Sequence, residues 1–205
     1  AFAAGTATIT EGTLMINIDD GSDLNFSEVT GYTDALAALT GNTVTELVKT
    51  GNGRVCVSDD ISAFTGILRV TAGVYAYTTK ESLGADATGA DVYVWSGATL
   101  EAKTDAEFSG YFKNKSTHFS GTGVVVDGVN MGVLLKTGSN ECWHGPFGKY
   151  LIMEDDALVR AASAKSIYFT SAELQMNGHD LTYVSYSSSQ FAIWTSVKVV
   201  DPGNV

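Results

Sequence analysis

Basic residues are scarce in this chain, and those present are scattered. The 205 residues include 12 lysines and arginines against 23 aspartates and glutamates, which gives a formal net charge of −11. Nucleic acids and anionic membranes are both bound through clustered Lys and Arg side chains. The composition therefore argues against nucleic acid and against an anionic membrane surface as partners.

Long hydrophobic runs are missing as well. The two longest, residues 123–126 and 131–135, are interrupted by Asp127 and Asn130. A membrane-spanning helix needs about 20 consecutive apolar residues, so we expect no membrane insertion. Disorder is not expected either, because 44% of the residues are hydrophobic and only 17% are charged.

Cysteine is nearly absent. Cys56 and Cys142 can form one disulfide in an oxidising compartment, and two buried free thiols fit the count equally well. The first residues, Ala1, Phe2 and Ala3, resemble the end that remains after a signal peptide is removed, although a fragment of a longer protein would begin in the same way. We expect an extracellular or bacterial cell-surface protein.

Helix signals are rare, and short strands dominate. The one convincing helix covers residues 34–39, with Thr33 as its N-terminal cap and Gly41 near its end. We expect residues 1–45 to form a strand-and-helix cap and residues 46–205 to form one continuous β domain. The strands expected in that domain lie near residues 54–57, 66–70, 74–77, 91–95, 99–102, 124–126, 131–135, 149–153, 158–161, 166–170, 174–176, 181–184, 191–194 and 197–200.

One short sequence occurs twice. Leu-Val-Lys-Thr-Gly at residues 47–51 returns as Leu-Leu-Lys-Thr-Gly at residues 134–138. Repetition within a chain of short strands indicates stacked units, as in a β-solenoid. A β-sandwich is the alternative, because regularly spaced short strands with turn signals also describe it.

The first copy belongs to a longer pattern. Its pieces are Lys-Thr-Gly-Asn-Gly at 49–53, Phe-Thr-Gly at 64–66, Val-Thr-Ala-Gly-Val at 70–74 and Ser-Gly-Ala-Thr-Leu at 96–100. Over residues 46–103 this pattern resembles the autotransporter-associated β-strand repeat of bacterial passenger domains, and residues 133–184 resemble it loosely. The resemblance implies a right-handed parallel β-helix at a cell surface and no particular catalysis.

Acidic pairs follow three strand-like runs. Calcium takes six to eight oxygen ligands, and carboxylates stacked at one corner of the fold could supply several. Alternatively, Asp simply favours turns through its own side-chain hydrogen bonds. Glycoside cleavage would need two of these carboxyl groups facing each other, about 5 to 10 Å apart. The candidate calcium ligands are Asp19, Asp20, Asp59, Asp60, Asp155 and Asp156.

Aromatic side chains give the clearest binding signal. Tyr75 and Tyr77 share one face of a strand, and Tyr93 and Trp95 share one face of the next. If the small aliphatic residues between them line the core, the four rings form an outward ladder for sugar rings or for another subunit. If they do not, the rings belong to the core or lie under a loop.

These patterns predict a secreted, non-enzymatic structural protein that self-assembles into an extracellular filament or layer. The alternative is an adhesin that binds glycans through the exposed aromatics, and a polysaccharide-active enzyme is the third hypothesis. His118, His144 and His179 match no Ser–His–Asp or zinc pattern. No catalytic residue is assigned, and calcium is the one cofactor considered.

Overall fold

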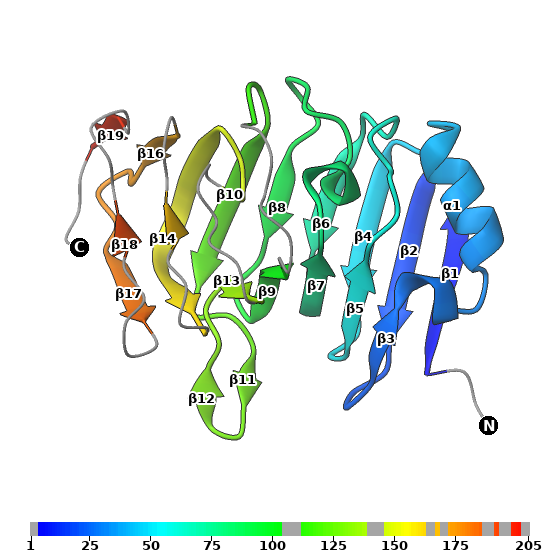
Figure 1. Cartoon of the computed structure of the whole chain (residues 1–205), viewed down its shortest axis with the longest axis horizontal. Coiled ribbons are helices and arrows are strands. Elements are labelled where there is room, and N and C mark those ends of the chain that lie inside the picture. The colour runs from blue at the N-terminus through cyan, green and yellow to red at the C-terminus, as the bar shows by residue number, and fades with distance from the viewer. Residues whose placement is uncertain are drawn as a thin grey trace.

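Figure 1 shows the protein, a computed structural model that describes residues 4–103, 112–138, 146–162, 167–168, 172–185, 191–192 and 198–201. Regular structure in these residues is almost entirely β. The helices are η1 (Phe26–Glu28), α1 (Tyr32–Thr40) and η2 (Lys80–Leu83). The strands are β1 (Gly5–Thr10), β2 (Thr13–Ile18), β3 (Asp23–Asn25), β4 (Glu46–Thr50), β5 (Arg54–Val57), β6 (Ile67–Val70), β7 (Gly73–Tyr77), β8 (Val92–Val94), β9 (Ala98–Lys103), β10 (Ser116–Gly121), β11 (Val125–Val126), β12 (Val129–Asn130), β13 (Leu134–Thr137), β14 (Tyr150–Ala161), β15 (Ile167–Tyr168), β16 (Glu173–Gln175), β17 (Leu181–Ser185), β18 (Phe191–Ala192) and β19 (Lys198–Val200).

The main strands form one mixed, largely parallel sheet that curls on itself. Hydrogen bonds link twelve of them along a single path, β1-β2-β4-β6-β8-β10-β14-β13-β9-β7-β5-β3. Along this path only β1 and β2 pair antiparallel. The result is a nearly closed barrel. The expected β-helix (β-solenoid) and its alternative, the β-sandwich, are therefore both wrong.

Strand β14 is what makes one sheet out of the two halves. It pairs with β10 near its start and with β13 at residues 159–161. In between, residues 154–156 stand opposite the single residue Ser120, which is a β-bulge. A bulge bends its strand and increases the local twist. The sequence predicted two separate strands here because the acidic residues 154–156 resemble a turn, whereas the chain continues as one bent strand.

The core lies between the two halves of the curled sheet. Tyr75 and Tyr77 on β7 are fully buried there, and their hydroxyl groups donate to the carbonyl oxygens of Ser82 (2.9 Å) and Pro146 (2.7 Å). Apolar side chains from the strands of both halves belong to the same core. Examples are Leu14, Ile16, Leu68, Val70, Val92, Leu100, Phe119, Leu134 and Leu151.

Helix α1 packs at the N-terminal end of the sheet, on the right in Figure 1. It buries Ala35, Ala38 and Leu39. The sequence placed a helix here, and Gly41 is its C-cap as expected. The predicted N-cap is wrong, because the helix starts one residue before Thr33 and is preceded by Gly31, whose φ is 88°.

The repeated Lys-Thr-Gly segments form two similar corners. Lys49 and Lys136 both point into the interior and are fully buried. The Lys49 ammonium donates to the carbonyl oxygens of Thr50 (2.8 Å), Gly51 (2.8 Å) and Ala72 (3.1 Å). The Lys136 ammonium donates to the carbonyl oxygen of Gly138 (3.2 Å). The repeated sequence therefore corresponds to a repeated local structure, in which a buried lysine donates to carbonyl oxygens of the following turn.

A hairpin of β11 and β12 projects from the bottom of the molecule in Figure 1. Its valines, Val125, Val126 and Val129, are 63%, 49% and 44% exposed. The turn residues Asp127 and Gly128 both have positive φ, as a two-residue hairpin turn requires. Across the described residues, no helix is both long and apolar enough to cross a membrane.

Candidate functional site

The four aromatic residues proposed as an outward ladder do not lie on one surface. Tyr75 and Tyr77 are in the core, so they cannot contact a ligand or another subunit. Strand β7 is buried on both faces, and alternation alone cannot tell which face points inward. Tyr93 and Trp95 do point away from the core, and Trp95 is 53% exposed.

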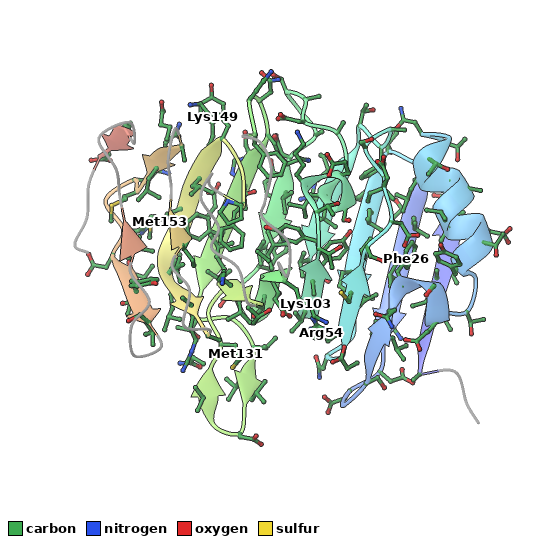
Figure 2. All side chains as sticks on the ribbon, in the orientation of Figure 1. Phe26, Arg54, Lys103, Met131, Lys149 and Met153 are labelled. Carbon is green, nitrogen blue, oxygen red and sulfur yellow. The ribbon has the colours of Figure 1, made fainter. Side chains whose placement is uncertain are left out.

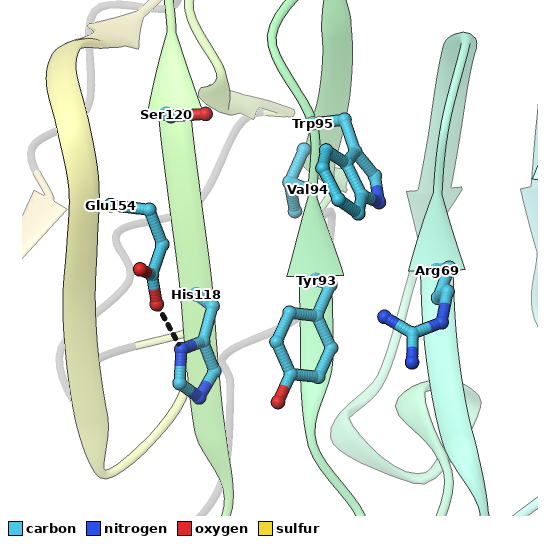
Figure 3. Close-up of a pocket in the computed structure, with 7 residues that line it drawn as sticks. All are labelled: Arg69, Tyr93, Val94, Trp95, His118, Ser120 and Glu154. Atoms are coloured by element: carbon cyan, nitrogen blue, oxygen red, sulfur yellow. Dashed lines mark hydrogen bonds and ion pairs between the residues drawn. The ribbon is translucent and has the colours of Figure 1, made fainter.

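Tyr93 is the centre of a three-residue stack across neighbouring strands. The parallel register places Arg69 on β6, Tyr93 on β8 and His118 on β10 side by side. The Tyr93 and His118 rings are stacked with centroids 4.4 Å apart and an interplanar angle of 13°. The Arg69 guanidinium carbon lies 4.8 Å from the Tyr93 ring centroid. Both faces of the Tyr93 ring are thus in use within the protein (Figure 3).

Acidic side chains hold both ends of this stack. Glu46 on β4 forms an ion pair with Arg69. A hydrogen bond of 2.6 Å joins Glu154 Oε1 on β14 to His118 Nδ1, and it is drawn as a dashed line in Figure 3. Glu154 is the first residue of the β14 bulge, and bulges re-aim side chains. The bulge therefore brings this carboxylate beside a ring on the neighbouring strand.

Trp95 and the stack border a depression of about 290 Å³ on the outer face of the sheet. We call it the aromatic depression. Its size is just below the usual range of small-molecule pockets, which begins at about 300 Å³. Trp95 is the one broadly exposed aromatic residue among those that line the depression. The lining residues are Arg69, Tyr93, Val94, Trp95, His118, Ser120 and Glu154.

The depression is equipped for binding. Arg69 offers guanidinium donors, Glu154 offers carboxylate acceptors, Ser120 offers a hydroxyl group and Trp95 offers an apolar ring face. A nucleophilic Ser–His–acid arrangement is not assembled, because Ser120 lies toward Trp95 and away from the second nitrogen of the His118 ring in Figure 3. The side chains that line the depression therefore suit a polar ligand that also has an apolar face.

The acidic pairs proposed as calcium ligands are not brought together. Asp59 accepts a 2.8 Å hydrogen bond from the Tyr32 hydroxyl. Asp60 accepts hydrogen bonds within its own turn from Ser62, which lower the pKa of Asp60. Asp19 and Asp20 follow β2, and the strands β4, β6, β8 and β10 separate them from β14. The turn interpretation therefore applies to Asp60, whereas Asp59 binds a residue distant in the sequence.

Asp155 and Asp156 do form a group with His179. One oxygen of each carboxylate lies 3.9 Å from His179 Nδ1, and the three donor atoms lie within 4.8 Å of one another. Each aspartate also accepts a backbone hydrogen bond, from Asp156 and Asp180 respectively. Zinc can use His and carboxylate ligands, whereas calcium takes only oxygen ligands. The two carboxylates are exposed, and we assign no metal to this group.

The cysteines give no disulfide in the described residues. Cys56 is a buried free thiol beside Val74 and Ala76, and burial is the main cause that raises its pKa. Cys142, like His144, lies outside the described residues. The free-thiol interpretation therefore applies to Cys56.

The sequence predicted that Tyr93 and Trp95 point outward, but it did not indicate that Arg69, His118 and Glu154 lie beside them. These residues are far apart in the chain and meet only through the parallel register. No strand was expected over β10, which contains a single large apolar residue, Phe119. No protein-family model matches the chain, and neither curated proteins nor solved structures gave a match.

Proposed function

We propose that this is an extracellular or cell-surface protein without enzymatic activity that binds glycans at the aromatic depression. The observation that carries the proposal is the exposed Trp95 ring beside a fixed set of hydrogen-bonding side chains. Sugar rings have apolar C–H faces and hydroxyl-bearing edges, so they need both kinds of partner. An indole face supports the first, and Arg69, Ser120 and Glu154 support the second.

Preorganisation supports the same proposal. Glu46 and Tyr93 fix the Arg69 guanidinium, and Glu154 and Tyr93 fix the His118 ring. Side chains that are already ordered lose less conformational entropy when a ligand binds. A shallow site can therefore reach useful affinity for a sugar.

The non-enzymatic part of the proposal rests on the carboxylates. Canonical glycoside hydrolysis uses two carboxyl groups that flank the bond to be cleaved. Among the described residues that line the depression, Glu154 is the single carboxylate, and it is bonded to His118. This arrangement supports binding better than hydrolysis.

The test is a glycan array followed by affinity measurement on Trp95→Ala. We expect binding of at least one glycan class, and a roughly ten-fold loss in the variant, which corresponds to about 1.4 kcal/mol. Met15→Ala is the matched control, because Met15 is an exposed apolar residue (44%) on the outer side of the same sheet. Equal affinity of Trp95→Ala and wild type would remove the depression as the binding site.

Self-association is a second candidate function, supported by the part of the β1 edge near Ile9. This strand ends the hydrogen-bonded path. Among the described residues, Thr30 bridges its outer side by accepting from the Ala7 amide and donating to the Gly5 carbonyl, and α1 packs against the strand. Because amides alternate in direction, the Ile9 amide also points away from β2. An unpaired edge of this kind can accept a strand from another copy.

Ile9→Pro tests this candidate by removing that amide without breaking a bond to β2. If filaments or oligomers grow through β1, electron microscopy and sedimentation will show them in the wild type and in Ile9→Thr, which keeps the amide. They will be lost in Ile9→Pro. A wild-type protein that stays monomeric at high concentration contradicts the candidate.

A further inference from the structure

The long axis of the aromatic depression runs across the strands. One border is the row Arg69, Tyr93 and His118, which crosses β6, β8 and β10 in register. The other border is formed by Trp95, two residues after Tyr93, and by Ser120, two residues after His118. Residues two apart on a strand share a face. The depression therefore runs between two rows and across the strands (Figure 3).

The length of the depression follows from the strand spacing. Its lining residues come from β6, β8, β10 and β14, which are consecutive neighbours in the sheet, and from Trp95 directly after β8. Three spacings of about 4.8 Å give roughly 14 Å from the first strand to the last. One sugar unit of an extended β-linked chain advances by about one such spacing. A single sugar would therefore leave much of the depression unused.

The charges of the depression limit what can bind. Glu46 compensates the positive charge of Arg69, and Glu154, at 55% side-chain exposure, adds a negative charge. The chain as a whole carries a formal charge of −11. A ligand with carboxylate or sulfate groups would be repelled, whereas hydroxyl groups can bond to both the guanidinium and the carboxylate.

We propose that the ligand is a linear, uncharged glycan of which about three sugar units lie across β6, β8, β10 and β14. One unit stacks on Trp95, and its neighbours reach Arg69 on one side and Ser120 and Glu154 on the other. This inference rests on the proposed glycan-binding function and adds the direction, the length and the charge class of the ligand.

A length series tests the inference by titration calorimetry. The probes are cello-, xylo- and manno-oligosaccharides of one to six units, with oligogalacturonates of the same lengths as charged counterparts. For the best neutral series we expect the affinity to rise at least ten-fold from one unit to three and to change less than three-fold beyond. Oligogalacturonates should bind at least ten-fold more weakly.

The outcomes separate this inference from the function beneath it. If neutral monosaccharides bind as well as trisaccharides, or if uronates bind best, the inferred ligand class is wrong while glycan binding stands. If no oligosaccharide or array glycan binds, the proposed function itself fails.

Two variants check the direction of the bound chain. Trp95→Ala should weaken every neutral length, because the stacked unit is common to all of them. Ser120→Ala should weaken a trisaccharide about three- to ten-fold and leave a monosaccharide unchanged. Gln175→Ala is the control. Gln175 on β16 pairs with Ile152, which pairs with His118, so it continues the same row across the sheet but does not line the depression. Equal losses for both lengths in Ser120→Ala contradict the crosswise orientation.

Discussion

At the scale of single residues, the inward lysines are the most unusual feature of this protein. Lys49 lies in register between Ile16 and Val70, and all three are fully buried. A buried ammonium is costly unless it is hydrogen-bonded. The backbone carbonyls of Thr50, Gly51 and Ala72 accept hydrogen bonds from the Lys49 ammonium, so the charge is hydrogen-bonded inside the fold. Side chain and corner thus satisfy each other.

Replacing this lysine should be costly even by a side chain of similar shape. Lys49→Met keeps the buried chain but leaves carbonyl groups unsatisfied, at about 1–3 kcal/mol. We expect this loss in the free energy of unfolding measured with urea at about pH 10.5, where the cost of burying a charge at Lys49 no longer opposes it. Lys113→Met, at an exposed position, should change it by less than about 0.5 kcal/mol. Similar stability of the two variants would mean that the carbonyls find other donors.

The interior lysines also make stability depend on pH. Burial lowers the pKa of Lys49 and of Lys115 to about 8, below the value of about 10.4 in an unfolded chain. Between these values the unfolded state binds more protons, so stability should rise as the pH increases from about 8 toward 10. Above pH 10 the trend should reverse, because burial raises the pKa of Tyr75 and raises the pKa of Tyr183 to about 12.

Urea unfolding at constant ionic strength from pH 7.5 to 11 measures this profile. The lysine contribution is the difference between the wild type and Lys49→Met, whose profile should rise less steeply. A wild-type profile no steeper than that of the variant below pH 10 would show that Lys49 titrates as it does in the unfolded chain.

At the scale of elements, local signals predicted where most strands lie but not how long they are or which way they face. Strands β5, β7 and β8 were expected close to their observed bounds. Strand β14 was split in two, because Glu154 to Asp156 have turn chemistry while the structure uses them as a bulge. The face of β7 could not be assigned, since both of its sides are buried. Side-chain pattern identifies a strand, whereas its neighbours decide its orientation.

The junction between β1 and α1 depends on one close approach. A Cβ atom on Gly31 would lie 2.5 Å from the Ala7 carbonyl oxygen, and the φ of Gly31 is 88°. We expect Gly31→Ala to lower the free energy of unfolding by about 2–5 kcal/mol, from backbone strain and from overlap.

Gly89→Ala is the control for this substitution. Gly89 has a similar φ of 86° but no atom within 4 Å of the added Cβ, so only the strain of about 1–2 kcal/mol remains. Thermal and urea unfolding of both variants give the comparison. Equal losses would mean that β1 and α1 adjust to the extra methyl group.

At the scale of the whole molecule, the sequence could not predict the curled single sheet or the site on it. The repeated Lys-Thr-Gly segments indicated stacked units, but whether two halves join into one sheet depends on the bend in β14. The aromatic depression combines four strands, and its stack joins residues 24 and 25 positions apart (93 − 69 and 118 − 93). Such a site exists only once the register is fixed. Figure 2 shows the side chains that all these strands carry.

The acylation rate of a buried lysine can report how often the fold opens around it. An acylating reagent modifies amines that solvent can reach, so Lys113 should react at once, while Lys115, two residues later and 1% exposed, should wait for the fold to open. In a proteolytic peptide that contains both lysines, labelling of Lys113 serves as the internal reference. Mass spectrometry of this peptide over time gives the slower labelling rate of Lys115, which measures the rate of opening. Equal labelling rates would show that this region opens freely. A purified sample could thus report its unfolding kinetics without denaturant.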